Sequence, residues 1–193
     1  MQSKVLIVGC GGLGIPVIEK IEKLNPDVKV VPYNTKLTSQ NALEMMKEYD
    51  MVADCSDNFP TRYLVNDACV MLDKPLSRGA VPRFEGLLMT ILPKVSACYR
   101  CVLEKPSTPG TVPSCREAGI PGATCGTIES LQAMEVIKYS AGVGGLLTGK
   151  LLVFYGLTFE FFTIDVKRNE KCPVCGDEPE IASLIDHENS CEG

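Results

Sequence analysis

The sequence lacks any long hydrophobic run, and no stretch approaches the roughly 18 apolar residues that a membrane-spanning helix needs. Its first residues, MQSKVLIVGCGG, lack the apolar core and small-residue cleavage site of a signal peptide. It also lacks clusters of Lys or Arg, and its formal net charge is -5. The charge pattern therefore excludes a typical nucleic-acid-binding surface. These absences predict a soluble, cytoplasmic protein without nucleic-acid or membrane partners.

The chain is long enough to bury a core, since it has 193 residues of which 45% are hydrophobic. We find no internal repeat in it. The last residues are polar and include the only histidine, His187, which we expect to be solvated. We therefore predict a single domain over residues 1–180 and a polar C-terminal tail over 181–193.

Short β-branched runs alternate with helical patterns in the first half of the chain. Strands are predicted over 4–8, 28–34 and 50–55, with helices over 15–24, 38–49 and 61–73. Paired strands follow around a turn near 79–86, and a helix over 126–141 precedes two closing strands. We also expect residues 94–121, rich in Pro, Ser, Thr and Gly, to form an exposed crossover loop. The pattern predicts an α/β, Rossmann-like fold: a mostly parallel sheet covered by helices, with antiparallel C-terminal strands.

The sequence contains ten cysteines, and four of them form the CxxC pairs Cys98/Cys101 and Cys172/Cys175. Each pair places two thiolates on one tight turn, and four thiolates complete tetrahedral zinc coordination without an open position for water. We predict one structural zinc ion that ties the crossover loop to the C-terminal segment. A redox dithiol or unpaired thiols are the alternatives.

A glycine-rich turn follows the first predicted strand and opens a helix. Its glycines, Gly9, Gly11, Gly12 and Gly14, would let backbone amides receive a phosphate group. A dinucleotide enzyme carries an acid roughly 20 residues further on, and here that stretch reads VKVVPYNTK. The missing acid argues against a nicotinamide- or flavin-linked oxidoreductase. A close-packed turn without a ligand is the alternative.

Several motifs together resemble one known family. They are VLIVGCGGLG, VADCSDNFPTRYLVNDAC, GAVPRFEG, SCREAGIPG, GTIESLQAMEVIKY and CPVCG, in this order over nearly the whole chain. The sequence resembles the MoeB/ThiF/HesA adenylyltransferases, relatives of ubiquitin-activating enzymes. The resemblance implies a homodimeric, zinc-bearing enzyme that uses ATP and Mg²⁺ to convert a carboxylate into an acyl-adenylate. The carboxylate would be the C-terminus of a ubiquitin-like sulfur carrier or belong to a small molecule.

Two positions would carry chemistry under this resemblance. Asp57, in the loop after the third predicted strand, matches the family's Mg²⁺ aspartate, and Asn58 would lie beside it at the nucleotide. An Asx turn at Asp57 or Asn58 is the alternative. Cys115, next to Arg116, aligns with a cysteine that forms a thioester or persulfide-linked intermediate in some members. An inert loop cysteine is the other interpretation.

The chain departs from the family after the glycine-rich turn. The family's ribose-binding Asp, and the Arg and Lys that contact the triphosphate, have no counterpart here. Basic residues elsewhere, Arg78 among them, are available to substitute. A second hypothesis is therefore a degenerate, non-catalytic zinc protein that binds a carrier protein or regulates a full-length paralogue.

Overall fold

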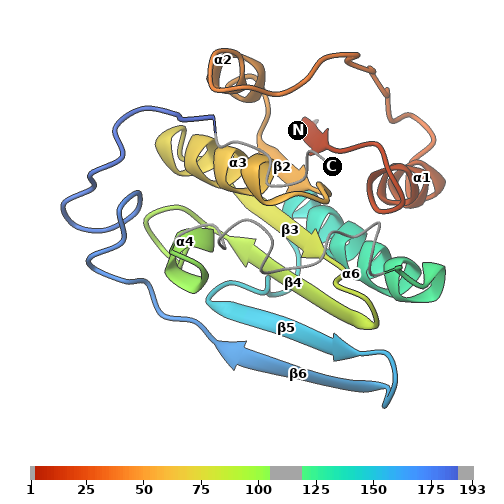
Figure 1. The fold of residues 1–193 in the computed structure, drawn as a ribbon. Coiled ribbons are helices and arrows are strands. Elements are labelled where there is room, and N and C mark those ends of the chain that lie inside the picture. The colour runs from red at the N-terminus through yellow and green to blue at the C-terminus, as the bar shows by residue number, and fades with distance from the viewer. Residues whose placement is uncertain (1–2, 105–118, 187–193) are drawn as a thin grey trace.

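The computed structural model describes residues 3–104 and 119–186. Its centre is one six-stranded sheet in the order β1-β2-β3-β4-β5-β6 (Figure 1). The first three strands run parallel to one another, and the later pairings are antiparallel. The strands are β1 Val5–Val8, β2 Met51–Asp54, β3 Leu76–Ala80, β4 Glu85–Ile91, β5 Lys150–Tyr155 and β6 Glu160–Asp165.

Helices cover both faces of this sheet. Alternate residues of β2 point to opposite sides: Val52 packs in the cluster that contains α3, whereas Met51 and Ala53 pack against Val136 of α6. The helices α1 and α6 contact each other on the second side (Figure 1). The helices are α1 Gly14–Leu24, α2 Ala42–Met46, α3 Phe59–Met71, α4 Tyr99–Val102 and α6 Gly122–Ala141.

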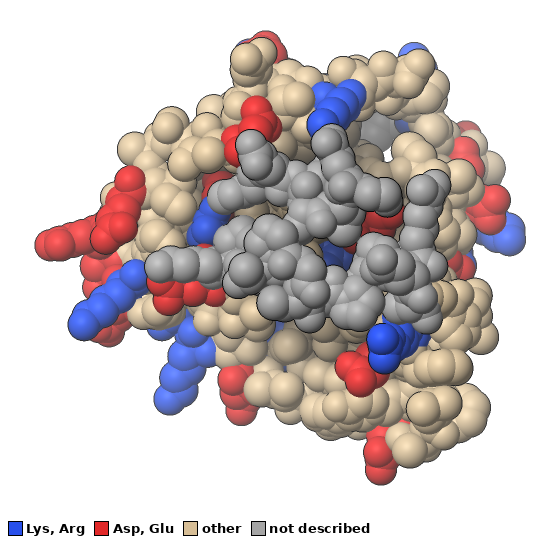
Figure 2. All heavy atoms as spheres, in the orientation of Figure 1, with Lys and Arg blue, Asp and Glu red and all other residues tan. Residues whose placement is uncertain are grey.

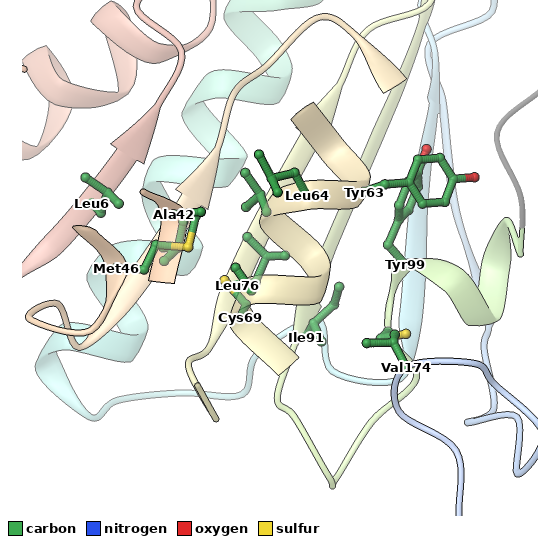
Figure 3. Packing of buried hydrophobic residues seen from close by; sticks show 14 of the residues in the cluster. Leu6, Ala42, Met46, Tyr63, Leu64, Cys69, Leu76, Ile91, Tyr99 and Val174 are labelled. Carbon is green, nitrogen blue, oxygen red and sulfur yellow. The ribbon is translucent and has the colours of Figure 1, made fainter. Parts of the chain in front are cut away.

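The largest hydrophobic cluster lies between the sheet and the helices α2, α3 and α4. Leu6, Met46 and Leu76 lie in its interior, and the rings of Tyr63 and Tyr99 lie side by side (Figure 3). The centroids of these two rings are 5.0 Å apart. The cysteines Cys98 and Cys172 belong to the same cluster. The candidate metal centre is therefore continuous with the main core.

The predicted fold class is confirmed, and the sheet is mixed, with two parallel and three antiparallel pairings. The strand expected over 28–34 was wrong, because residues 29–36 are exposed coil. The strand β1, at one edge of the sheet, has only four residues, and Pro32 in this run has no N–H to donate. A β-branched run forms a strand only where a neighbouring strand pairs with it.

Two other expectations need correction. The helix expected over 38–49 is only the short α2. The loop expected to be exposed from residue 94 is buried over residues 96–100, where α4 begins. This part of the chain is buried because its backbone and side chains hydrogen-bond to α3.

Basic and acidic side chains are interspersed over the described part of the face shown in Figure 2. No helix of residues 3–104 and 119–186 is long and apolar enough to cross a membrane. Ile181 and Leu184, in the predicted tail, are partly buried against the main cluster. His187 lies outside the described residues.

Candidate nucleotide site and metal centre

The glycine-rich turn connects β1 to α1 as predicted. Gly9 adopts a left-handed φ of 95°, and a Cβ there would lie 3.0 Å from the carbonyl oxygen of Cys55. A Cβ on Gly14 would overlap the carbonyl oxygen of Gly9. By contrast, a Cβ on Gly11 or Gly12 would meet no atom within 4 Å. Gly9 and Gly14 are therefore required by packing, whereas Gly11 and Gly12 leave open space in front of the helix N-terminus, where a phosphate would approach.

Asp57 and Asn58 lie in the loop between β2 and α3. Asn58 is the N-cap of α3, since its Oδ1 accepts a hydrogen bond of 2.9 Å from the backbone N–H of Thr61. Its Nδ2 donates to Asp57 Oδ1 at 3.2 Å. Asp57 is exposed at the carboxyl edge of the parallel strands. The structure thus gives Asn58 a capping role and holds the Asp57 carboxylate at the edge where ligands of such folds bind.

Two arginines lie beside this loop. Arg62, on α3, donates through Nε and Nη2 to the carbonyl oxygen of Ser56 at 3.3 and 3.2 Å. Arg78, on β3, is only 4% exposed, and its Nε lies 3.9 Å from Asp54 Oδ2. The sequence alone does not predict that Arg78 lies beside Asp54, because this contact depends on the register that pairs the two residues across β2 and β3.

The four CxxC cysteines come together from opposite ends of the chain's second half. Their Sγ atoms all lie within 4.8 Å of one another, with separations of 3.9 Å for Cys98 and Cys101, 3.6 Å for Cys98 and Cys172, and 3.4 Å for Cys101 and Cys175. Tetrahedral zinc with Zn–S bonds of about 2.3 Å places its sulfur ligands about 3.8 Å apart. A disulfide needs about 2.05 Å. The cluster therefore has the spacing of a metal site and not of disulfides.

The electrostatics of the cluster also suit a cation. Hydrogen bonds among the thiols, helped by burial, raise the pKa of Cys98 and Cys175. The hydrogen bonds that Cys101 receives lower its pKa. The protein alone thus favours the thiolate at only part of the set, and a divalent cation that bound there would displace the remaining thiol protons and be held by four thiolates. The backbone N–H of Asn169 donates to Cys101 Sγ at 3.4 Å and so orients one ligand.

A buried polar network fixes α4, which carries the first cysteine pair, to α3. Arg100 forms a bidentate pair with Asp67, Nε to Oδ1 at 2.8 Å and Nη2 to Oδ2 at 2.7 Å. Asn66 Oδ1 accepts from the backbone N–H of Tyr99 at 2.8 Å. The guanidinium of Arg100 also lies over the ring of Tyr63. This network fixes the turn of the first cysteine pair to α3.

Other cysteines differ in accessibility. Cys10, in the glycine-rich turn, is exposed, whereas Cys55 and Cys69 are buried. Burial raises the pKa of both Cys55 and Cys69. Cys115, the predicted nucleophile, lies outside the described residues, so its role stays a prediction.

Comparison with known proteins decides the family. A model of the ThiF family matches residues 17–174, which is most of the chain. The protein belongs to the ThiF family. This ThiF-family chain is 39% identical over 239 residues to the sulfur carrier protein adenylyltransferase of Thermus thermophilus, covering 98% of the chain and 88% of that relative. The expected MoeB/ThiF/HesA relationship is thereby confirmed.

Other ThiF-type relatives are longer. The chain is 37% identical over 234 residues to the adenylyltransferase and sulfurtransferase MOCS3 of Bos taurus, and it spans only 51% of that protein. Among solved structures, Escherichia coli MccB shares the fold with a TM-score of 0.75 at 16% identity, over 96% of this chain and 67% of MccB. MccB has also been solved with ATP, and that structure has a TM-score of 0.74 at 17% identity, over 91% of this chain and 67% of MccB.

The comparisons also support a shortening of this ThiF-family chain. The alignment with the Thermus relative extends over 239 residues, more than the 193 of the chain, so that relative has residues without a counterpart here. The family match starts at residue 17, after Gly14. That the shortening follows the glycine-rich turn stays a prediction from the sequence.

Proposed function

We propose that the protein is an ATP-dependent adenylyltransferase that activates the C-terminal carboxylate of a ubiquitin-like sulfur carrier. The observation that carries this proposal is the 39% identity to a sulfur carrier protein adenylyltransferase over 98% of the chain. A small-molecule carboxylate is the other substrate of the same chemistry. The enzyme would act as a homodimer in the cytoplasm.

In this reaction a carboxylate oxygen attacks the α-phosphorus of ATP. The new O–P bond forms as the bond to the β-phosphate bridging oxygen breaks, so the products are an acyl-adenylate and pyrophosphate. Catalysis of such transfers depends mainly on positioning and charge neutralisation. Gly11 and Gly12, around which a Cβ would meet no atom, would admit the phosphates near the N-terminus of α1, and the exposed carboxylate of Asp57 would hold Mg²⁺.

We further propose that the four-cysteine cluster holds a structural zinc ion. Four thiolates leave no position for water or substrate, so this ion would not take part in the transfer. Its function would be to fix α4, and the chain that continues from α4 toward Cys115, against residues 172–175. If Cys115 is the nucleophile, its thiolate would take the acyl group from the acyl-adenylate as a thioester and release AMP.

A second candidate is a non-catalytic ThiF-fold protein that binds a carrier protein or regulates a longer paralogue. The feature that favours it is the missing counterpart to the family's ribose-binding Asp and to the Arg and Lys that contact the triphosphate, and the Thermus relative has residues without a counterpart here. A protein of this kind would keep the fold and the metal centre and would not turn over ATP.

An ATP–pyrophosphate exchange assay separates the two candidates. The protein is incubated with Mg²⁺, ATP, labelled pyrophosphate and a carrier protein that ends in Gly-Gly, and label entering ATP is measured. The adenylyltransferase predicts exchange that depends on the carrier and is lost in Asp57→Asn. No exchange with any carrier or small carboxylate, together with no ATP binding by calorimetry, would establish the non-catalytic protein instead.

A further inference from the structure

Buried polar atoms without hydrogen bonds are concentrated at one place in the structure. Among the described residues, those atoms are Asp54 Oδ2, Ser56 Oγ, Ser77 Oγ, Arg78 Nε and Tyr99 OH. Three of these atoms lie together, because Asp54 ends β2, Ser56 follows it, and Arg78 in the middle of β3 is paired with Asp54. Ser77, the second residue of β3, points to the opposite face of the sheet. Folded proteins satisfy nearly all buried polar groups, so a cluster of exceptions needs an explanation.

Sequence periodicity explains why charged groups lie here. Val52 and Leu76 face the main core, and the residues two positions further along each strand, Asp54 and Arg78, point to the same side. The register places Asp54 between Val8 of β1 and Arg78 of β3. The next residue after Val8 is Gly9, the first residue of the glycine-rich turn. Arg78 is thus level with the start of that turn across the parallel sheet.

Arg100 provides an internal comparison for Arg78. Both guanidinium groups are buried, and each lies over a tyrosine ring, Arg78 at 3.9 Å from the centroid of Tyr99 and Arg100 at 4.7 Å from that of Tyr63. Arg100 binds the Asp67 carboxylate through two hydrogen bonds. Arg78 reaches Asp54 only at 3.9 Å, and its Nε has no acceptor among the described residues. Stacking on Tyr99 leaves the Nε–H of Arg78, which lies in the guanidinium plane, to donate to a planar or tetrahedral oxyanion.

A second positive charge is close to Arg78. Burial first, and then the charge of Arg62, lower the pKa of Arg78, while Tyr99 and Asp54 act in the opposite direction. Arg62 contacts Ser56 O, in the same loop against which Gly9 packs. Two guanidinium groups facing one loop repel each other, and an anion between them would relieve that repulsion.

We propose that Arg78, with Arg62 beside it, binds an oxyanion of the substrate at the carboxyl edge of β1–β3. The oxyanion is a phosphate group of the nucleotide or the carboxylate that becomes activated. This inference rests on the proposed adenylyl transfer, and it assigns to Arg78 a share of the charge neutralisation that the shortened segment no longer supplies.

Direct observation of the arginine side chains tests the proposal on the full-length, metal-loaded protein. The Nε–Hε signals are recorded by ¹H–¹⁵N NMR, and the Arg78 signal is assigned from its loss in Arg78→Lys. Two probes are titrated separately: inorganic pyrophosphate with Mg²⁺, and glycylglycine. A saturable shift of the Arg78 signal with pyrophosphate identifies the phosphate, and a shift with glycylglycine identifies the carboxylate. If neither probe moves the signal, Arg78 is only a counter-ion for Asp54 and the proposal is overturned.

Calorimetry adds a quantitative arm. Arg78→Lys keeps the positive charge but loses the planar set of N–H donors. The dissociation constant of the probe that shifts the NMR signal should therefore rise about tenfold or more. Lys94→Met is the control: it also alters one cation, but Lys94 is exposed, pairs with Asp73 and follows β4 at the opposite edge of the sheet. The Lys94→Met variant should bind the same probe with the affinity of the wild type.

The outcomes separate this inference from the proposed function. If Arg78→Lys catalyses carrier-dependent ATP–pyrophosphate exchange at the wild-type rate, the adenylyltransferase function is supported and the role of Arg78 is refuted. If glycylglycine shifts the Arg78 signal but the protein neither binds nor turns over ATP, the oxyanion site at Arg78 is supported and the adenylyltransferase function is refuted.

Discussion

The buried pair of Arg100 and Asp67 allows a stability prediction whose size follows from the structure. These residues are 5% and 3% exposed, and two hydrogen bonds join them between α4 and α3. Arg100→Met replaces the arginine by an unbranched apolar side chain that fills the space of its stem. The substitution leaves the Asp67 carboxylate buried without its cation. Breaking a buried pair in this way typically costs about 3–5 kcal/mol. For a chain of this length, that corresponds to a fall in Tm of about 6–20 °C.

Urea unfolding followed by far-ultraviolet circular dichroism, with zinc present in all samples, measures the loss. The matched control is Lys94→Met, which removes an exposed ion pair with Asp73 and should cost less than about 1 kcal/mol. In the double variant Asp67→Leu/Arg100→Met the unpaired charge is gone, so most of the loss should be recovered. A cost for Arg100→Met no larger than that of the control would refute the reasoning, and so would a double variant less stable than Arg100→Met.

Three further predictions concern the cysteines and the glycine-rich turn. The purified protein should contain about one zinc per chain, and Cys172→Ser should lower that content and destabilise the fold, as measured by elemental analysis and thermal unfolding; unchanged zinc would refute the site. Iodoacetamide followed by peptide mapping should label Cys10 rapidly at pH 8 and leave Cys55 unlabelled until the protein unfolds, because burial both shields that thiol and raises its pKa. Gly14→Ala should cost about 1–3 kcal/mol because its Cβ would overlap Gly9 O, whereas Gly12→Ala should change stability by less than about 0.5 kcal/mol; equal effects would contradict the packing described for the turn.

Local patterns predicted well those elements whose signals are local. The β-branched run before Gly9 and the helix after it follow from residues adjacent in the chain. Two CxxC pairs predicted that their four cysteines would meet, although 74 positions separate Cys98 from Cys172. A ligand set of this kind can be predicted from the sequence because a tetrahedral metal site needs all four cysteines together.

Patterns failed where the outcome depends on distant partners. The run over 28–34 has strand-forming residues but pairs with no strand in the described part of the chain. In α6, Ile128, Leu131 and Met134 have the spacing of an apolar helix face. Met134 is nevertheless 53% exposed, while Gln132 and Glu135 are buried. Gln132 Nε2 donates to the carbonyl oxygens of Asp54 and Ser77, at 3.0 and 3.2 Å. The sequence could not predict these buried polar contacts, because they depend on which strand carbonyls face the helix.

The four-cysteine cluster also constrains the chain as a polymer. A metal ion bound there would join the turn at Cys98–Cys101 to the turn at Cys172–Cys175 and close a loop that contains α6, β5 and β6. By the chain-entropy model used for disulfides, a cross-link over about 74 residues removes about 4 kcal/mol of unfolded-state entropy. The outermost strand β6 is exposed along its whole length and contributes little to the core. Such a cross-link would therefore stabilise the folded positions of β5 and β6 mainly by lowering the entropy of the unfolded chain. Burial of hydrophobic surface by β6 would contribute little.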